Sequence, residues 1–115
     1  MEFDIESNIS YIENKINELE KFTVQKEPFT RLVFSKEFYE ARSWLKHEYD
    51  KLGLLVSTDE SGNLIGTLNS KIDTDKIVIV GSHIDTVPSG GKFDGIAGVV
   101  AALCLIKHIK NNDID

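Results

Sequence analysis

The segment GSHIDTVPSGGKFDG, residues 81–95, decides the fold and the chemistry predicted for this chain. It places one imidazole and two carboxylates in a glycine-rich loop: His83, Asp85 and Asp94. Four β-branched residues, 77–80, come directly before it. Because they do not alternate with polar residues, they predict a strand buried on both faces of a mixed or parallel sheet. A helix is predicted from about residue 93 to residue 110, and its nearly continuous apolar character predicts that it is largely buried.

Two more helices and a hairpin are predicted upstream. The first helix is indicated by apolar residues at helical spacing: Ile5, Ile9, Ile12, Ile16 and Leu19. Residues 21–34 have no clear period and predict a connector. Ser35 stands where the N-cap of a second helix belongs, and Gly53 is placed to end that helix in a left-handed conformation. Two β-like runs, 54–58 and 64–68, flank a turn-forming stretch and predict a hairpin. These elements predict an α/β fold.

Composition limits the chain to one small soluble domain. It has 115 residues with a formal net charge of −6 and a pI near 5.0, which argue against nucleic acid or an anionic membrane as a partner. The acidic start lacks the basic-then-apolar pattern of a signal peptide. Cys104 is the single cysteine, so no internal disulfide can form, and a reducing compartment is expected. The cytoplasm is therefore the predicted location.

The three polar residues of the segment suit a metal site. A neutral His83 ring can offer one nitrogen to a divalent ion, and Asp85 is close enough in sequence to bond the other. Asp94 is expected to open the last helix, where the helix dipole favours a carboxylate. From there its two oxygens could bridge a pair of metal ions. The alternative is that His83 and Asp85 form a chance pair and that the glycines only serve tight turns.

Other chemistries find little support in the sequence. A phosphate-binding Walker loop fails because Thr86 stands where its first glycine is needed and Phe93 follows Lys92. No G-x-S-x-G nucleophile elbow is present. His47 and His108 lie in predicted helices without acidic or cysteine partners at ligand spacing, so they are interpreted as ordinary surface or packing residues. Cys104, in an apolar helix, is interpreted as an inert buried thiol.

The segment 81–95 resembles the signature of the zinc-type amidohydrolases that include N-carbamoyl-L-amino acid hydrolase, allantoate amidohydrolase and β-ureidopropionase. These enzymes belong to a superfamily of dinuclear metallopeptidases that also contains aminoacylase. Residues 30–32, 41–45 and 59–64, together with Gly66, are similar as well, so the resemblance runs from about Ile5 to Lys110. It implies a partial three-layer α/β/α catalytic domain of the zinc-peptidase type.

The resemblance also implies roles for the three residues. His83 would ligate one metal, Asp94 would bridge two, and Asp85 would be the carboxylate that orients His83. Two divalent ions would complete such a site, and zinc, manganese, cobalt and nickel all accept ligands of this kind. The substrates implied are small N-carbamoyl or ureido compounds.

Family members continue with parts that these 115 residues lack: a pair of adjacent glutamates, one of them the general base, further histidine ligands, and a lid and dimerisation domain. Residues 1–115 are therefore expected to be an incomplete portion of the catalytic domain. Two hypotheses follow. The chain is part of a metal-dependent amidohydrolase, with a peptidase or aminoacylase as the variant within the superfamily. Alternatively, it is a truncated or split-gene product that is inert alone or acts only with a complementary C-terminal chain, and the homodimer contacts of the family are absent.

Overall fold

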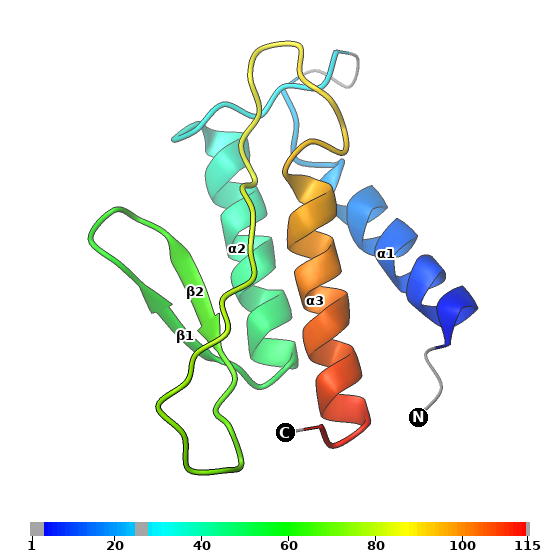
Figure 1. Cartoon of the computed structure of the whole chain (residues 1–115). Helices are drawn as coiled ribbons and strands as arrows, with labels where there is room; N and C mark the ends of the chain where they lie inside the picture. Colours follow the sequence, from blue (N-terminus) through cyan, green and yellow to red (C-terminus); the bar gives the residue numbers. More distant parts are fainter. Residues whose placement is uncertain (1–3, 25–27, 115) are drawn as a thin grey trace.

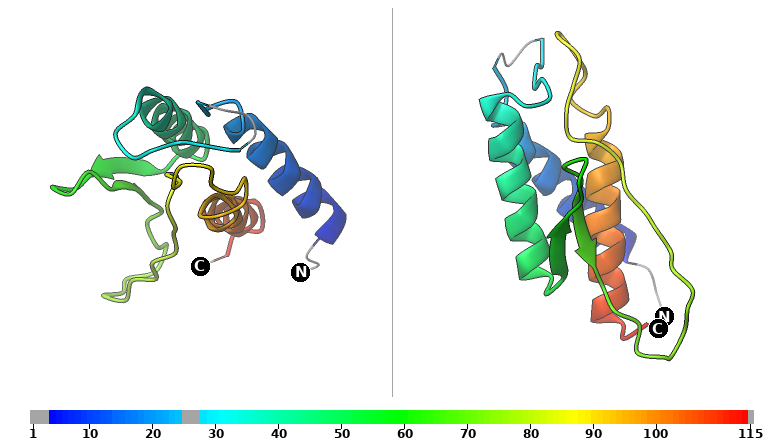
Figure 2. Two further views of the ribbon diagram at one scale, coloured as in Figure 1. Left: turned by 90° about the horizontal axis from the view of Figure 1, so that it is seen from above. Right: turned by 90° about the vertical axis from the view of Figure 1, so that its left-hand side faces the viewer.

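Helices dominate the structure, a computed structural model that describes residues 4–24 and 28–114. The elements, in chain order, are α1 (Ile5–Leu19), α2 (Lys36–Lys51), β1 (Leu55–Thr58), β2 (Leu64–Thr67) and α3 (Ile96–Asn111). The three helices pack side by side, and the hairpin lies against α2 (Figure 1). After β2 the chain runs as a long extended segment past the helices and returns through a loop to the start of α3 (Figure 2). The predicted connector 21–34 contains residues 25–27, which lie outside the described part.

Local signals place the ends of α1 and α2. The Asp4 carboxylate accepts a hydrogen bond from the Ser7 N–H at 3.0 Å and caps α1. The Ser35 hydroxyl accepts one from the Phe38 N–H at 3.1 Å, which confirms the predicted N-cap of α2. Gly53 follows that helix with φ +66°, the left-handed conformation predicted for it.

The predicted hairpin is confirmed, with β1 and β2 antiparallel and Leu55 opposite Thr67. Its turn is held by the Asp59 carboxylate, which accepts hydrogen bonds from the N–H groups of Ser61 and Asn63 at 3.0 and 2.9 Å. These bonds satisfy backbone donors that the turn leaves without strand partners.

One hydrophobic core joins the three helices and the loop that precedes α3. Its buried members are Ile16, Leu19, Ala41, Leu45, Ile84, Ile96, Val99, Val100 and Leu103. The predicted apolar stripe of α1 is therefore only half buried, because Ile5 and Ile9 at its beginning remain 64% and 51% exposed. α1 contacts α3, and of its apolar stripe Ile16 and Leu19 are buried in the core that the two helices share.

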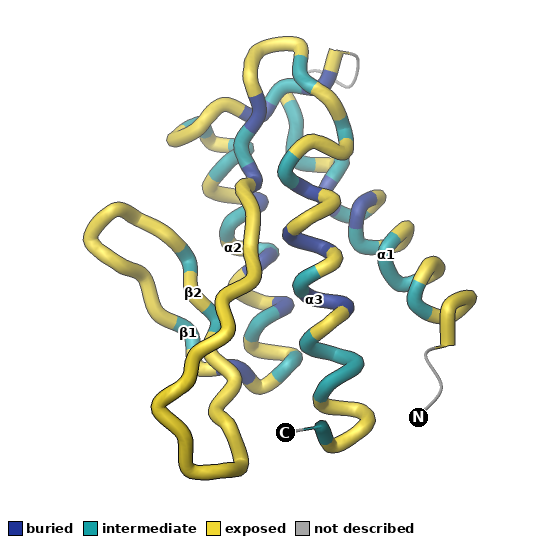
Figure 3. Tube along the Cα trace, in the orientation of Figure 1, coloured by how far each residue is buried: buried dark blue, intermediate teal, exposed yellow. Residues whose placement is uncertain are grey.

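The predicted buried strand at residues 77–80 is wrong. These residues run extended without strand partners, and the side chains of Ile77, Val78 and Ile79 are 83%, 93% and 90% exposed (Figure 3). A strand needs neighbouring strands for its backbone groups and other layers for its side chains. Within residues 4–24 and 28–114 the sheet contains only β1 and β2, so neither is supplied.

The last helix differs from its prediction in two respects. It begins at Ile96 rather than near residue 93, and only one of its faces is buried, with Leu105 on the other side 43% exposed. The overall α/β class is nevertheless confirmed, as helices combined with a small two-stranded sheet. Among the described residues, no helix has both the length and the apolar character needed to cross a bilayer.

Candidate metal site

The structure brings together the three residues that the sequence singled out. His83 lies between the two carboxylates: its Nδ1 is 3.5 Å from Oδ1 of Asp85, and its Nε2 is 3.9 Å from Oδ2 of Asp94. All three side chains reach solvent, with exposed fractions of 50%, 40% and 73% for His83, Asp85 and Asp94. The imidazole therefore faces one carboxylate with each of its nitrogens.

Hydrogen bonding fixes which ring nitrogen of His83 is free. Nδ1 lies 3.0 Å from the backbone carbonyl oxygen of Asp85. A carbonyl oxygen can only accept a hydrogen bond, so Nδ1 must carry the proton. In the neutral ring, Nε2 then holds the lone pair, and it points toward Asp94. The sequence predicted that the Asp85 side chain would hold this ring, but the backbone of the same residue makes the shorter contact.

Asp94 does not cap the last helix as predicted. Gly95 occupies the N-cap position of α3, and no side chain caps that end. The carbonyl of Asp94, rather than its carboxylate, takes part in the turn by accepting from the Ile96 N–H at 2.8 Å. Its carboxylate is therefore free of backbone partners and remains available on the His83 side of the loop.

Glycine at position 95 makes room for the imidazole. Gly95 has φ +70°, and a Cβ atom there would lie 2.4 Å from the His83 carbonyl oxygen and 2.6 Å from ring atoms Cε1 and Nδ1. These distances are too short for a side chain of any kind. Gly98, in the first turn of α3, gives similar room to Ser82, because a Cβ atom at position 98 would lie 2.8 Å from the Cβ of Ser82.

The loop that carries His83 is attached to the connector between α1 and α2. The Arg31 N–H donates to the Thr86 hydroxyl at 2.8 Å, and the Thr86 N–H donates to the Arg31 carbonyl at 2.7 Å. The Ser89 N–H donates to the Thr30 hydroxyl at 2.9 Å, and Phe29 pairs with Gly90 in an isolated antiparallel bridge. These contacts join two segments that are distant in sequence.

A lysine further along the loop ties it to α1. Lys92 Nζ lies 3.0 Å from the Glu20 carboxylate and 3.2 Å from the side-chain oxygen of Asn17. The loop is thus held on one side by the connector and on the other by the end of α1. This attachment limits the conformations open to His83 and Asp94.

Arg31 is the residue near the site that the sequence analysis did not single out. Its side chain is fully buried and its guanidinium donates to the Ile84 carbonyl, between His83 and Asp85. Burial lowers the pKa of Arg31 to about 10, although the charge of Asp85 acts in the opposite direction. In the sequence, Arg31 stands within the segment 30–32 that takes part in the resemblance, directly before the apolar pair Leu32 and Val33, but nothing there indicates its role.

The donor set fits a divalent metal in part. Nitrogen and oxygen ligands lie about 2.0–2.2 Å from zinc in a tetrahedral arrangement, so two donors to one ion are about 3.4 Å apart. The 3.9 Å between His83 Nε2 and Asp94 Oδ2 exceeds that spacing by about 0.5 Å, so the two atoms are close to, but not at, the separation of ligands on one ion. Catalytic zinc usually has three protein ligands. In the described part of the chain, no group of three or more His, Cys, Asp or Glu side chains could hold a metal ion. The loop therefore offers half of a site.

The remaining candidates lie away from this loop. His47 is exposed on α2, and His108 of α3 contacts Asn112, the residue that follows this helix. Cys104 is buried beside Asn8, and burial raises the pKa of its thiol, which agrees with an inert side chain.

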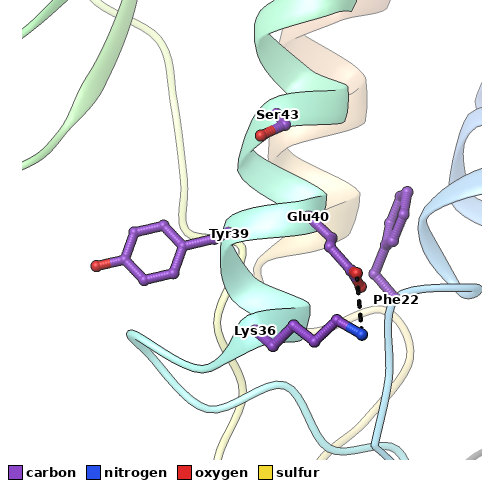
Figure 4. Close-up of a pocket in the computed structure, with 5 residues that line it drawn as sticks. All are labelled: Phe22, Lys36, Tyr39, Glu40 and Ser43. Atoms are coloured by element: carbon purple, nitrogen blue, oxygen red, sulfur yellow. Dashed lines mark ion pairs between the residues drawn. The ribbon is translucent and has the colours of Figure 1, made fainter.

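A hollow of about 550 Å³ lies near the start of α2, away from the three site residues (Figure 4). It is lined by Phe22, Lys36, Tyr39, Glu40 and Ser43. Lys36 and Glu40, one turn apart on α2, form an ion pair at 3.6 Å in its lining. None of these residues belongs to the His83 loop, so the hollow and the candidate metal site are separate.

The chain resembles known proteins both in sequence and in structure. No protein-family model matches the chain. It is 42% identical over 81 residues to allantoate amidohydrolase of Bacillus subtilis and 39% identical over 84 residues to N-carbamoyl-L-amino-acid amidohydrolase of a Pseudomonas species. These alignments cover 70% and 73% of this chain.

A hydantoinase/carbamoylase family amidase from Burkholderia multivorans has a similar structure, with a TM-score of 0.86 and 26% identity. That match covers 92% of this chain and 26% of the amidase. The chain spans 20% of the length of each of the two curated relatives. By sequence and by fold, the chain belongs to the family of amidohydrolases that contains allantoate amidohydrolase and N-carbamoyl-L-amino-acid amidohydrolase.

Proposed function

We propose that this chain supplies one wall of the active site of a metal-dependent amidohydrolase that cleaves C–N bonds outside peptides. The substrate class would be N-carbamoyl amino acids, ureido acids or allantoate, since relatives carry the names of allantoate, N-carbamoyl-L-amino-acid and ureidoglycolate hydrolases. The observation that supports this proposal most directly is the position of His83. Its Nε2 lies 3.9 Å from the Asp94 carboxylate, while its Nδ1 is hydrogen-bonded to the Asp85 carbonyl.

Each of the three residues has a separate task in this proposal. His83 presents its Nε2 lone pair, Asp94 presents a carboxylate with two free oxygens, and Asp85 holds the ring in one tautomer. A pair of divalent ions such as zinc, manganese, cobalt or nickel, when bound, would polarise a carbonyl and generate hydroxide at neutral pH. The chain's own contribution is to hold two ligands and keep their geometry.

A second proposal concerns these 115 residues by themselves: they do not turn over substrate until residues outside them supply the remaining ligands and a general base. Two donors are fewer than catalytic zinc normally requires, and residues 4–24 and 28–114 contain no larger ligand cluster. The missing groups could come from a complementary chain or from further residues of a longer protein. The single cysteine supports the reducing cytoplasm as the place where it would act.

Metal titration of the 115-residue chain tests the first proposal. We expect Co²⁺ or Zn²⁺ to bind with measurable heat, and His83→Ala and Asp94→Asn each to lower the affinity at least about tenfold. His47→Ala is the matched control, since it removes an exposed imidazole on α2 and should leave binding unchanged. Equal affinity in His83→Ala and His47→Ala would show that the loop is not a metal site.

An assay of ammonia release from an N-carbamoyl amino acid and from allantoate tests the second proposal, that the chain is inactive by itself. We expect the 115-residue chain alone to release no ammonia in the presence of Co²⁺ or Zn²⁺. Turnover by the isolated chain that disappears in His83→Ala would overturn the view that it is inactive by itself, while supporting the metal role of His83.

A further inference from the structure

The guanidinium of Arg31 lies where a charged group is hard to accommodate. The residue has 0% exposure. Arg31 takes part in none of the ion pairs found among the described residues. No carboxylate of these residues therefore lies within 4.0 Å of its nitrogens. Removing such a charge from water carries a penalty of several kcal/mol, which a buried cation offsets only through well-made hydrogen bonds. A buried, unpaired arginine therefore calls for a structural reason.

Its hydrogen bonds connect the end of α1 to the loop that carries His83. Nη1 donates to the carbonyls of Leu19 and Phe22 at 2.9 and 2.7 Å, and Nε donates to the Ile84 carbonyl at 2.7 Å. The carbonyls at a helix C-terminus lack partners within the helix and lie at its negative end, so a cation is favoured there. Nη2 is buried without a partner.

The loop side of this connection lies in the middle of the candidate site. Ile84 is the residue between His83 and Asp85, and its carbonyl is fixed by Arg31 Nε. Two residues further, Thr86 exchanges hydrogen bonds with the backbone of Arg31 at 2.8 and 2.7 Å. The peptide units on both sides of Asp85 are thus held by one residue. The orientation of the Asp85 carbonyl, which accepts from His83 Nδ1, depends on those peptide units.

A lysine could not substitute for Arg31. The planar guanidinium donates in fixed directions from separate nitrogens, whereas a lysine ammonium donates from a single atom. One atom cannot take the places of both Nε, on Ile84, and Nη1, on Leu19 and Phe22. The cation–π contact of the guanidinium over the Phe29 ring, 5.1 Å from the centroid, further fixes its plane.

We propose that Arg31 is a positioning residue for the metal half-site: by clamping the Ile84 carbonyl and Thr86 to the end of α1, it holds His83 in the Nδ1-protonated tautomer with Nε2 directed to the metal. The effect on metal binding rests on the proposed function, whereas the effect on the His83 tautomer does not.

The test compares Arg31→Lys and Arg31→Gln with Val100→Ala in the full 115-residue chain. Val100 is fully buried in α3, in the same core as Ile84, and its apolar side chain forms no hydrogen bond, so its truncation controls for a general loss of core stability. Long-range ¹⁵N NMR of the His83 ring reports its tautomer in folded molecules, and Co²⁺ titration reports affinity. Both Arg31 variants should give a tautomer-averaged ring and about 10–100-fold weaker Co²⁺ binding per folded molecule. Val100→Ala should change neither readout.

A third variant keeps the proposal testable if both Arg31 variants fail to fold. Thr86→Val removes the hydroxyl that accepts from the Arg31 N–H but retains the guanidinium, and it should shift the ring in the same direction. A single Nδ1-protonated tautomer in every folded variant at positions 31 and 86 would overturn the proposal. If the wild-type chain binds no Co²⁺, the metal function fails, and the tautomer measurement still decides the role of Arg31.

Discussion

At the scale of single residues, Gly95 decides whether the imidazole of His83 can occupy its observed position. Its φ of +70° is a conformation that other L-residues rarely adopt, and the space that a Cβ would fill is taken by His83. The two constraints act together, since relieving the contact would require moving either the ring or the start of α3. A loop glycine that looks like a simple turn former is in this way part of the site.

Gly95→Ala should therefore lower the free energy of unfolding by about 1–3 kcal/mol, because a strained backbone and a displaced imidazole are both introduced. Urea unfolding followed by circular dichroism measures the change, and metal titration shows whether His83 has moved. Gly91→Ala is the control, since nothing lies within 4 Å of the position of its Cβ. Equal stability of the two variants would contradict the role given to Gly95.

At the scale of elements, residues 77–80 form an apolar segment with its backbone unpaired in the described structure. Ile77, Val78 and Ile79 present large β-branched side chains to solvent, and extended backbone of this kind readily adds to another strand. Such a segment, with high β-propensity and no charge, is a typical site of self-association.

Val78→Lys should make the chain markedly more monomeric, because a charge at the most exposed of these positions opposes strand pairing. Light scattering with size-exclusion chromatography, as a function of concentration, gives the association state. Val33→Lys adds the same charge at a connector residue that is 48% exposed and should have a smaller effect. If both variants associate like the wild-type chain, the segment 77–80 is not the contact.

Features that depend on local contacts could be predicted from the sequence, whereas features that depend on distant contacts could not. Ser35 and Gly53 act within a few residues of themselves, so the bounds of α2 followed from their chemistry. Residues 77–80 need partners that no local pattern reveals, and their predicted burial was wrong. In the site, His83 and Asp85 are two positions apart and their proximity was predictable. Arg31 was missed because it reaches the loop across more than fifty residues.

At the scale of the whole molecule, α1 and α2 are joined through a buried carboxylate. Glu48 is 3% exposed and lies 2.8 Å from Lys15 and 2.7 Å from Lys51. Burial alone raises the pKa of the Glu48 carboxyl, but the hydrogen bonds from the two lysines outweigh it and leave the pKa below its usual value. A lowered pKa in the folded state stabilises the fold above the unfolded pKa of about 4.3, and this stabilisation is lost as the pH falls through the folded value.

Glu48→Gln should thus lower the free energy of unfolding at pH 7 by about 1–3 kcal/mol, because it removes the charged acceptor of the largely buried Lys15 ammonium, which then keeps only Glu18 as an ion-pair partner. The difference from the wild-type chain should shrink as the pH is lowered from 5 to below the folded pKa. Urea unfolding at a series of pH values tests both expectations. Glu40→Gln, which breaks an exposed pair with Lys36, should change stability by at most about 0.5 kcal/mol at any pH.

The pairing of Arg31 with Thr86 also has a cost in chain entropy. The two residues are 55 positions apart, and closing a flexible loop of that length costs about 3.5 kcal/mol from its logarithmic term alone. α2 and the hairpin lie inside this loop, so once they have folded, a much shorter disordered span remains to be closed. The entropic cost of ordering the loop that carries His83 therefore depends on α2 and the hairpin, which contain none of the proposed ligands. Unfolding of α2 would raise that cost and loosen the loop, although α2 does not carry His83.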